Sequence, residues 1–129
     1  MIIADTSAWV EYFRATGSRA HLHLRPLLGT GELATTSVVV MELVAGARRR
    51  RDLEQVNRVA VSARLLRARE PEDYLAAATI YRACRAGGET IRTMLDCVIA
   101  AIALRTGAQV LHHKRDFTAI ARHTPLQLA

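Results

Sequence analysis

The chain has 129 residues, half of them hydrophobic, and a net charge of +6 at neutral pH. This length suits one compact domain and excludes two ordinary ones, and the apolar content can form a core without disulfides or a structural metal. The two cysteines, Cys84 and Cys97, lack the spacing of a zinc or redox motif, which predicts buried, reduced thiols.

The sequence indicates a soluble, cytoplasmic protein. It begins without the basic and apolar regions of a signal peptide, and its longest apolar run, Met94–Leu104, contains Asp96 and falls short of the roughly 20 residues that span a bilayer. The basic excess is almost all arginine, which binds phosphate and attracts nucleic acid. Because GC-rich coding also enriches arginine, the charge alone leaves a nucleic-acid partner open.

Short apolar strands alternate with helices along the first half of the chain. Capping residues, glycines and a proline set the expected boundaries. The expected elements are a strand at 1–4, a helix from Thr6 or Ser7 to Gly17, a second helix from Ser18 to Leu28 that breaks at Pro26, a strand at 32–36, and a helix at 38–45 capped by Ser37.

The alternation continues in the second half and predicts a parallel sheet covered on both faces. Ligands bind beyond the carboxyl ends of such strands, which directs attention to Asp5, Ser37 and residues 112–116. The expected elements are an amphipathic helix after the basic run 48–51, a strand at 65–66, a helix from Pro71 to Gly87, a helix at 94–105 capped by Thr93, a strand at 109–112, a short helix at 117–121 and an edge strand at 126–128.

Two carboxylates of the first half of the chain lie near expected strand ends. Asp5 follows the first strand and is suited to capping the next helix, although Thr6 and Ser7 are available for that role. Glu42 lies in an apolar run, 38–45, with apolar residues on every side of the helix. An arginine or a metal ion must compensate a carboxylate buried there, and both alternatives remain open.

Asp96 and Asp116 occupy similar positions in the second half. Asp96 stands where the acid of a capping box belongs, three residues after Thr93, but aspartate reaches back to the cap poorly. The helix around Asp96 is otherwise apolar on all faces, so we expect it to be central, with Asp96 pointing out of the core to the same rim. Asp116 is explained equally well by helix capping, by pairing with Arg115 or by function.

Together these acids suit one or two hard divalent cations, which take oxygen ligands and keep several waters. Such ions activate a water molecule, orient it towards a phosphodiester and stabilise the leaving oxygen. Other chemistry fits poorly, because no Walker loop, HExxH or GxSxG sequence is present and the adjacent His112 and His113 supply at most one base. The run Arg48–Arg51 is typical of a solvated face as well as of an RNA site.

Four segments in a fixed order carry a family resemblance: Ile3–Ser7 (IADTS), Met41–Leu43 (MEL), Thr90–Ala101 (TIRTMLDCVIAA) and Arg115–Phe117 (RDF). In order and spacing they resemble PIN-domain proteins, specifically the VapC-type toxins of bacterial toxin–antitoxin pairs. The resemblance covers nearly the whole chain, and the segment around Asp96 is its most specific part.

The resemblance implies an α/β protein, a three-layer α/β/α PIN-like domain with a central, mostly parallel sheet, as a single nuclease domain over residues 1–129. It also implies an endoribonuclease toxin that cleaves RNA with a metal-activated water and depends on Mg²⁺ or Mn²⁺. The resemblance further implies a homodimer, and a cognate antitoxin whose C-terminal segment covers the active site.

The matching motifs also imply roles for single residues. Asp5 and Asp96 would bind the metal directly, and Glu42 would bind the metal or hold its water. Thr6 or Ser7 would orient these ligands without binding the metal. These roles follow from the resemblance, since the residue pattern by itself leaves each acid open to a structural explanation.

The segment before Arg115 departs from the family pattern. Many relatives have an acid or asparagine just before RDF, where this chain has His113 and Lys114. The fourth acidic position is therefore either Asp116 or effectively missing. Lys114 is expected to weaken a second metal site or to contact phosphate, which favours one metal over two. Arg92 resembles the family's arginine before the third acid and is expected to act on the electrostatics of the site or on the substrate.

Two other functions remain open at this point. The chain could be a basic RNA-binding module without catalysis, in which the acids are caps and ion pairs. It could also be a housekeeping PIN nuclease without an antitoxin. Nothing in the sequence reads out bases, so the RNA target is not specified.

Overall fold

The computed structural model describes residues 1–129, with a four-stranded parallel sheet at its centre. The strand order is β3–β2–β1–β4, and all neighbours run parallel. The strands are β1 (Ile2–Ala4), β2 (Leu33–Thr35), β3 (Arg64–Leu65) and β4 (Gln109–Leu111). The inner strand β1 pairs through Ile3 with Ala34 on one side and with Val110 on the other.

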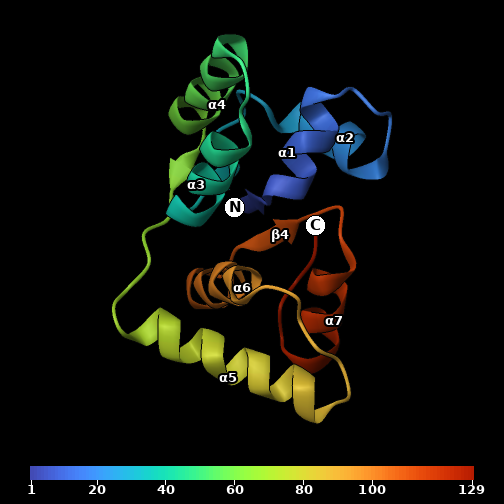
Figure 1. Ribbon diagram of the computed structural model, residues 1–129, viewed down its shortest axis with the longest axis vertical. Helices are drawn as coiled ribbons and strands as arrows, with labels where there is room; N and C mark the ends of the chain where they lie inside the picture. The colour runs from blue at the N-terminus through green and yellow to red at the C-terminus, as the bar shows by residue number, and fades with distance from the viewer.

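Helices connect the strands, as parallel pairing requires. In Figure 1, α1 to α4 occupy the upper part of the molecule and α5 to α7 the lower part, with β4 between them. The expected three-layer α/β/α arrangement with a parallel sheet is confirmed. The helices are α1 (Thr6–Phe13), α2 (Arg19–Leu24), the 3₁₀ turn η1 (Arg25–Leu27), α3 (Ser37–Gly46), α4 (Arg50–Ser62), α5 (Glu72–Ala86), α6 (Met94–Thr106) and α7 (Arg115–His123).

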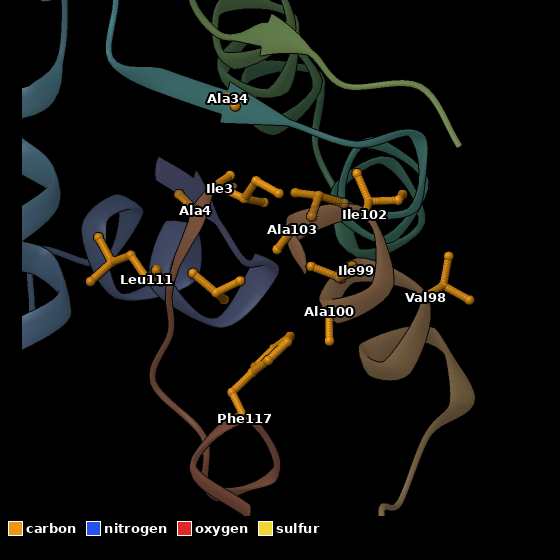
Figure 2. Packing of buried hydrophobic residues seen from close by; sticks show 14 of the residues in the cluster. Ile3, Ala4, Ala34, Val98, Ile99, Ala100, Ile102, Ala103, Leu111 and Phe117 are labelled. Carbon is orange, nitrogen blue, oxygen red and sulfur yellow. The ribbon is translucent and has the colours of Figure 1, made fainter. Parts of the chain in front are cut away.

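Helix α6 is the central helix of the molecule, as its all-round apolar sequence predicts. Every residue from Asp96 to Ala103 is buried. Figure 2 shows Ile102 and Ala103 of α6 beside Ile3 of β1, with Phe117 of α7 below the same helix. Thirty-one buried apolar residues form one continuous cluster around this contact. Burial of that cluster supplies the main driving force for folding.

Several element boundaries differ from the sequence expectation. Helix α1 ends at Phe13 rather than at Gly17, because the chain turns at Ala15, which has a left-handed φ of 49°. Thr36 rather than Ser37 caps α3, with its hydroxyl accepting from the backbone N–H of Val39 at 3.3 Å. Strand β3 lies one residue earlier than expected, α7 is longer at both ends, and the expected edge strand is reduced to a single bridge between residues 110 and 128.

Two expectations about the whole chain can be compared directly with the structure. None of the helices combines the length and the apolarity that crossing a bilayer requires. Cys84 and Cys97 are free and buried, as expected of thiols that pack as small apolar side chains.

Candidate active site at the strand ends

The carboxyl ends of β1, β2 and β4 meet at one rim of the sheet. Asp5 directly follows β1, Thr36 follows β2, and the loop 112–114 follows β4. The backbone N–H of Asp5 donates to the carbonyl of Leu111 at 2.9 Å, which holds the ends of the two strands together. This rim is the place where parallel α/β sheets bind ligands.

Asp5 is fully buried and is itself the N-cap of α1. Its Oδ2 accepts from the backbone N–H of Ser7 at 3.0 Å and from the Ser7 hydroxyl at 2.6 Å. The expectation that Thr6 or Ser7 caps this helix is therefore wrong, because the carboxylate already satisfies the free first-turn N–H. The Ser7 oxygen in turn accepts from the backbone N–H of His113 at 2.9 Å, which links Asp5 to the loop after β4.

Asp96 lies in the first turn of α6 and is fully buried. Thr93 caps this helix through the backbone N–H of Leu95, and Asp96 makes no reciprocal capping-box bond. Its Oδ1 instead accepts from Lys114 Nζ at 2.8 Å. Burial raises the pKa of Asp96 to about 6; the bond from Lys114 opposes this rise, and the charges of Asp5 and Asp116 add to it.

Lys114 places a cation between the two buried acids. It is the only lysine in the chain, and its Nζ lies 2.8 Å from Asp96 Oδ1 and 3.6 Å from Asp5 Oδ2. Burial alone lowers the pKa of Lys114, but the neighbouring carboxylates of Asp5 and Asp96 raise it above its usual value. The ammonium group therefore stays charged and compensates both acids. The sequence indicated that Lys114 reaches this rim but not that it pairs with both candidate ligands.

Glu42 approaches the same site from α3. Its Oε1 accepts from the hydroxyl of Thr6 at 3.0 Å, which joins α3 to the start of α1. The expectation of a carboxylate surrounded by apolar side chains is wrong in one respect. Helix α3 leaves Met41 and Val44 about half exposed, and Glu42 is only partly buried. Its charge is close enough to raise the pKa of Lys114.

Asp116 is buried in the first turn of α7 and pairs with Arg92 rather than with its neighbour Arg115. Arg92 Nε lies 3.5 Å from Asp116 Oδ2, and the arginine is largely exposed. Asp116 contributes to the raised pKa of Asp96, so the two carboxylates lie within electrostatic range. Lys114 forms ion pairs with Asp5 and Asp96, whereas the ion pair of Asp116 is with Arg92 and not with Lys114.

The two histidines at the rim contact different residues. His112 accepts at Nδ1 from the backbone N–H of Lys114 at 3.1 Å, and burial lowers the pKa of His112. His113 faces Glu11 of α1, with 3.2 Å between Nε2 and Oε1. Sequence reasoning missed this last pair, because residues about a hundred positions apart gave no signal of their contact.

The donor atoms at this rim fit a divalent cation. Asp5 Oδ1 and Asp96 Oδ2 are buried and have no hydrogen-bond partner. An unsatisfied buried carboxylate oxygen is costly, and it is also the ligand type that Mg²⁺ and Mn²⁺ prefer. No three His, Cys, Asp or Glu side chains converge into a closed metal cage. The arrangement therefore suits an ion that two carboxylates hold and that keeps several waters.

The chain is similar over its full length to known proteins. The family model for the PIN domain matches residues 2–123. The chain is 45% identical to ribonuclease VapC11 of Mycobacterium tuberculosis, over all of this chain and 98% of that protein.

Two solved structures share the fold. The VapBC2 structure from Rickettsia felis, bound to a promoter DNA fragment, has a TM-score of 0.77 at 16% identity, covering 100% of this chain and 98% of the other. A toxin–antitoxin complex from Klebsiella pneumoniae has a TM-score of 0.72 at 16% identity, covering 99% and 100%. The sequence resemblance is thus confirmed: the chain belongs to the PIN domain family, and within it to the VapC ribonucleases.

Proposed function

We propose that this chain is an endoribonuclease toxin that hydrolyses RNA with the help of a divalent cation, as one nuclease domain over residues 1–129. The observation that carries the proposal is the pair of buried, unpartnered carboxylate oxygens of Asp5 and Asp96 at the rim of the sheet. Full-length likeness to a ribonuclease supports RNA as the substrate.

The proposed cofactor is Mg²⁺, with Mn²⁺ as an equivalent oxygen-binding ion. When bound, such an ion polarises a water molecule and stabilises the leaving oxygen of a phosphodiester. Asp5 and Asp96 would hold it, and Ser7 fixes the orientation of Asp5 through its two hydrogen bonds. Glu42, held by Thr6, is the carboxylate that can accept a proton from water near the ion.

We further propose that this site takes a single divalent ion. The Nζ of Lys114 already lies against Asp5 and Asp96 and supplies one positive charge there. A second ion next to this ammonium group would meet like-charge repulsion at close range. Asp116, the candidate fourth acid, has a partner in Arg92. With the ion in place, Lys114 is available to contact a phosphate oxygen of the substrate.

Inhibition by a cognate antitoxin and a homodimeric assembly are part of the same proposal. The fold shared with a solved toxin–antitoxin complex supports the antitoxin. Large exposed apolar side chains, including Met41 and Val44 on α3 and Tyr74 and Leu75 on α5, offer surfaces for protein contacts. Expression alone and together with a candidate antitoxin distinguishes a toxin, which arrests growth only when alone, from a housekeeping nuclease, which does not.

The isosteric variants Asp5→Asn and Asp96→Asn test the catalytic proposal. Loss of a residue that only supports a metal ligand typically costs about 10- to 100-fold in activity. We expect each aspartate variant to lose more than this, while circular dichroism shows that folding is retained. Glu54→Gln, at an exposed acid of α4, is the matched control and should keep full activity. Full cleavage by either aspartate variant, or by the unmodified protein in EDTA, would contradict the proposal and favour an RNA-binding module without catalysis.

A further inference from the structure

A groove of about 900 Å³ between the end of α1 and the beginning of α4 carries a concentration of positive charge that the proposed reaction leaves unexplained. Five arginines and one aspartate line it, so it carries a net charge of four positives. The lining residues are Val10, Phe13, Arg14, Gly46, Arg48, Arg49, Arg51, Asp52, Gln55 and Arg58.

Most of these arginines have no counter-charge. Arg49 pairs with Asp52 at 3.4 Å. The other four, Arg14, Arg48, Arg51 and Arg58, make no salt bridge and are exposed. Four uncompensated guanidinium groups around one groove repel one another. A bound polyanion would remove this repulsion and release its own counterions.

The groove begins about one helical turn from the Thr6–Glu42 contact beside the acidic site. The hydrogen bond between Thr6 and Glu42 joins α1 and α3 beside that site. One helical turn further along each helix are Val10 and Gly46, which line the groove. Arg14 follows after another turn of α1, and its position lies about 12 Å along the helix axis from Thr6 at 1.5 Å per residue. A few nucleotides of one RNA strand span this distance.

We propose that this groove binds backbone phosphates of the same RNA strand whose phosphodiester lies at Asp5 and Asp96. The RNA class of the ligand rests on the proposed function; the location rests on the groove itself. Arginine grips phosphate through two parallel N–H donors, independently of base identity. The groove therefore offsets the repulsion between the acidic site and the substrate.

An acidic protein segment is the competing occupant, and the lining argues against it. The residues that carry most of the affinity of a protein interface, chiefly Trp, Tyr and Arg, lie in well-packed, fully desolvated pockets, whereas the groove arginines are exposed. Here only Val10 and Phe13 are apolar, and Phe13 already stacks on Trp9 with 5.9 Å between ring centroids. Charged, solvated walls suit a phosphate backbone better.

The test compares two double variants that each remove two exposed arginines. Arg48→Gln with Arg51→Gln alters the groove; Arg82→Gln with Arg85→Gln on α5 makes the same charge change far from it. The probe is a labelled oligouridylate of about 12 nucleotides, bound in EDTA at several salt concentrations. We expect the groove variant to bind the oligouridylate more weakly than the parent protein. Its plot of log K against log salt should be less steep by about 1.4, or about 0.7 for each of the two lost phosphate contacts. The α5 variant should keep the parent slope.

Three results are distinguishable. Metal-dependent cleavage by the parent protein, with a higher KM and an unchanged kcat only in the groove variant, supports the proposal. If the parent protein cleaves RNA but both variants bind RNA equally well, the groove assignment is overturned and the proposed function stands. In that case, loss of oligoglutamate binding in the groove variant would assign the groove to an acidic protein. No cleavage by the parent protein contradicts the proposed function, whatever the binding data give.

Discussion

The contact between Lys114 and the two buried aspartates determines the properties of the metal-free site. Two carboxylates in a low-dielectric environment repel each other and lose hydration, which costs several kcal/mol without compensation. The ammonium group of Lys114, 2.8 Å from Asp96 and 3.6 Å from Asp5, supplies that compensation. The protein can therefore fold before it binds a metal, and the ion finds a preformed pair of ligands.

Replacing Lys114 by methionine should expose this dependence. The change leaves Asp5 and Asp96 buried without a counter-charge, and because Lys114 is partly exposed we expect a loss of about 2–4 kcal/mol in the free energy of unfolding. Urea denaturation in EDTA measures it. The control Lys114→Arg keeps the charge and should lose much less. Equal stability of the methionine variant and the parent protein would show that the ammonium group does not compensate the acids.

Single residues also mark the limit of what the sequence predicts. Asp5 and Asp96 were found because each stands next to an apolar segment at the start of an expected helix, a pattern that depends only on local sequence. The ion pair of Asp73 with Arg105, at 2.8 Å, was missed, because residues so far apart in the sequence give no local signal of their contact. The contact of Lys114 with the acids was missed for a related reason: pairing partners depend on tertiary packing, which composition and spacing do not encode.

At the scale of elements, Glu89 connects the segment between α5 and α6 to the end of α7. Its carboxylate bonds to Arg122 and, at 2.7 Å, to His123 Nε2. The bonds from Arg122 and then His123 lower the pKa of Glu89 from 4.5 to about 2. The His123 ring also occupies the space where a side chain at Gly87 would lie. The end of α5, the segment that follows it and the end of α7 thus meet at one partly exposed ionic cluster.

This cluster should contribute to acid sensitivity. Because the folded pKa of Glu89 lies below its usual value, its stabilising effect is complete above about pH 4.5 and disappears as the pH falls towards 2. We expect the melting temperature of the parent protein to fall more between pH 5 and pH 3 than that of Glu89→Gln. Calorimetry at both pH values, with Glu54→Gln as the control, measures the difference. Parallel decreases in all three proteins would exclude a role for Glu89.

Element types and order were predictable from the sequence to a larger extent than their ends. Helix α6 was expected and found as the central helix, because an all-round apolar sequence has no stable place at the surface. The same reasoning was less accurate for α3, whose residues Met41 and Val44 remain exposed. The end of α1 at Phe13 was missed, because a left-handed residue at Ala15 carries no sequence signal comparable to a glycine.

At the scale of the whole molecule, the proposed metal ligands come from distant parts of the chain. Asp5 begins α1 directly after the inner strand β1, whereas Asp96 begins the buried helix α6. In Figure 1, α1 lies in the upper part of the molecule and α6 in the lower part. An ion that both carboxylates bind therefore bridges the two parts, and its binding energy adds to the free energy of global unfolding.

Metal addition should accordingly stabilise the parent protein as a whole. At a Mn²⁺ concentration about ten times the dissociation constant, the gain is about 1.4 kcal/mol, which corresponds to a rise of about 4–8 °C in melting temperature for a chain of this size. Asp96→Asn should lose the rise, because one of the two charged ligands is gone, and Glu54→Gln should keep it. Differential scanning calorimetry with and without Mn²⁺ measures both. A rise that persists in Asp96→Asn and in Asp5→Asn would place the ion elsewhere on the protein and would contradict the site proposed at this rim.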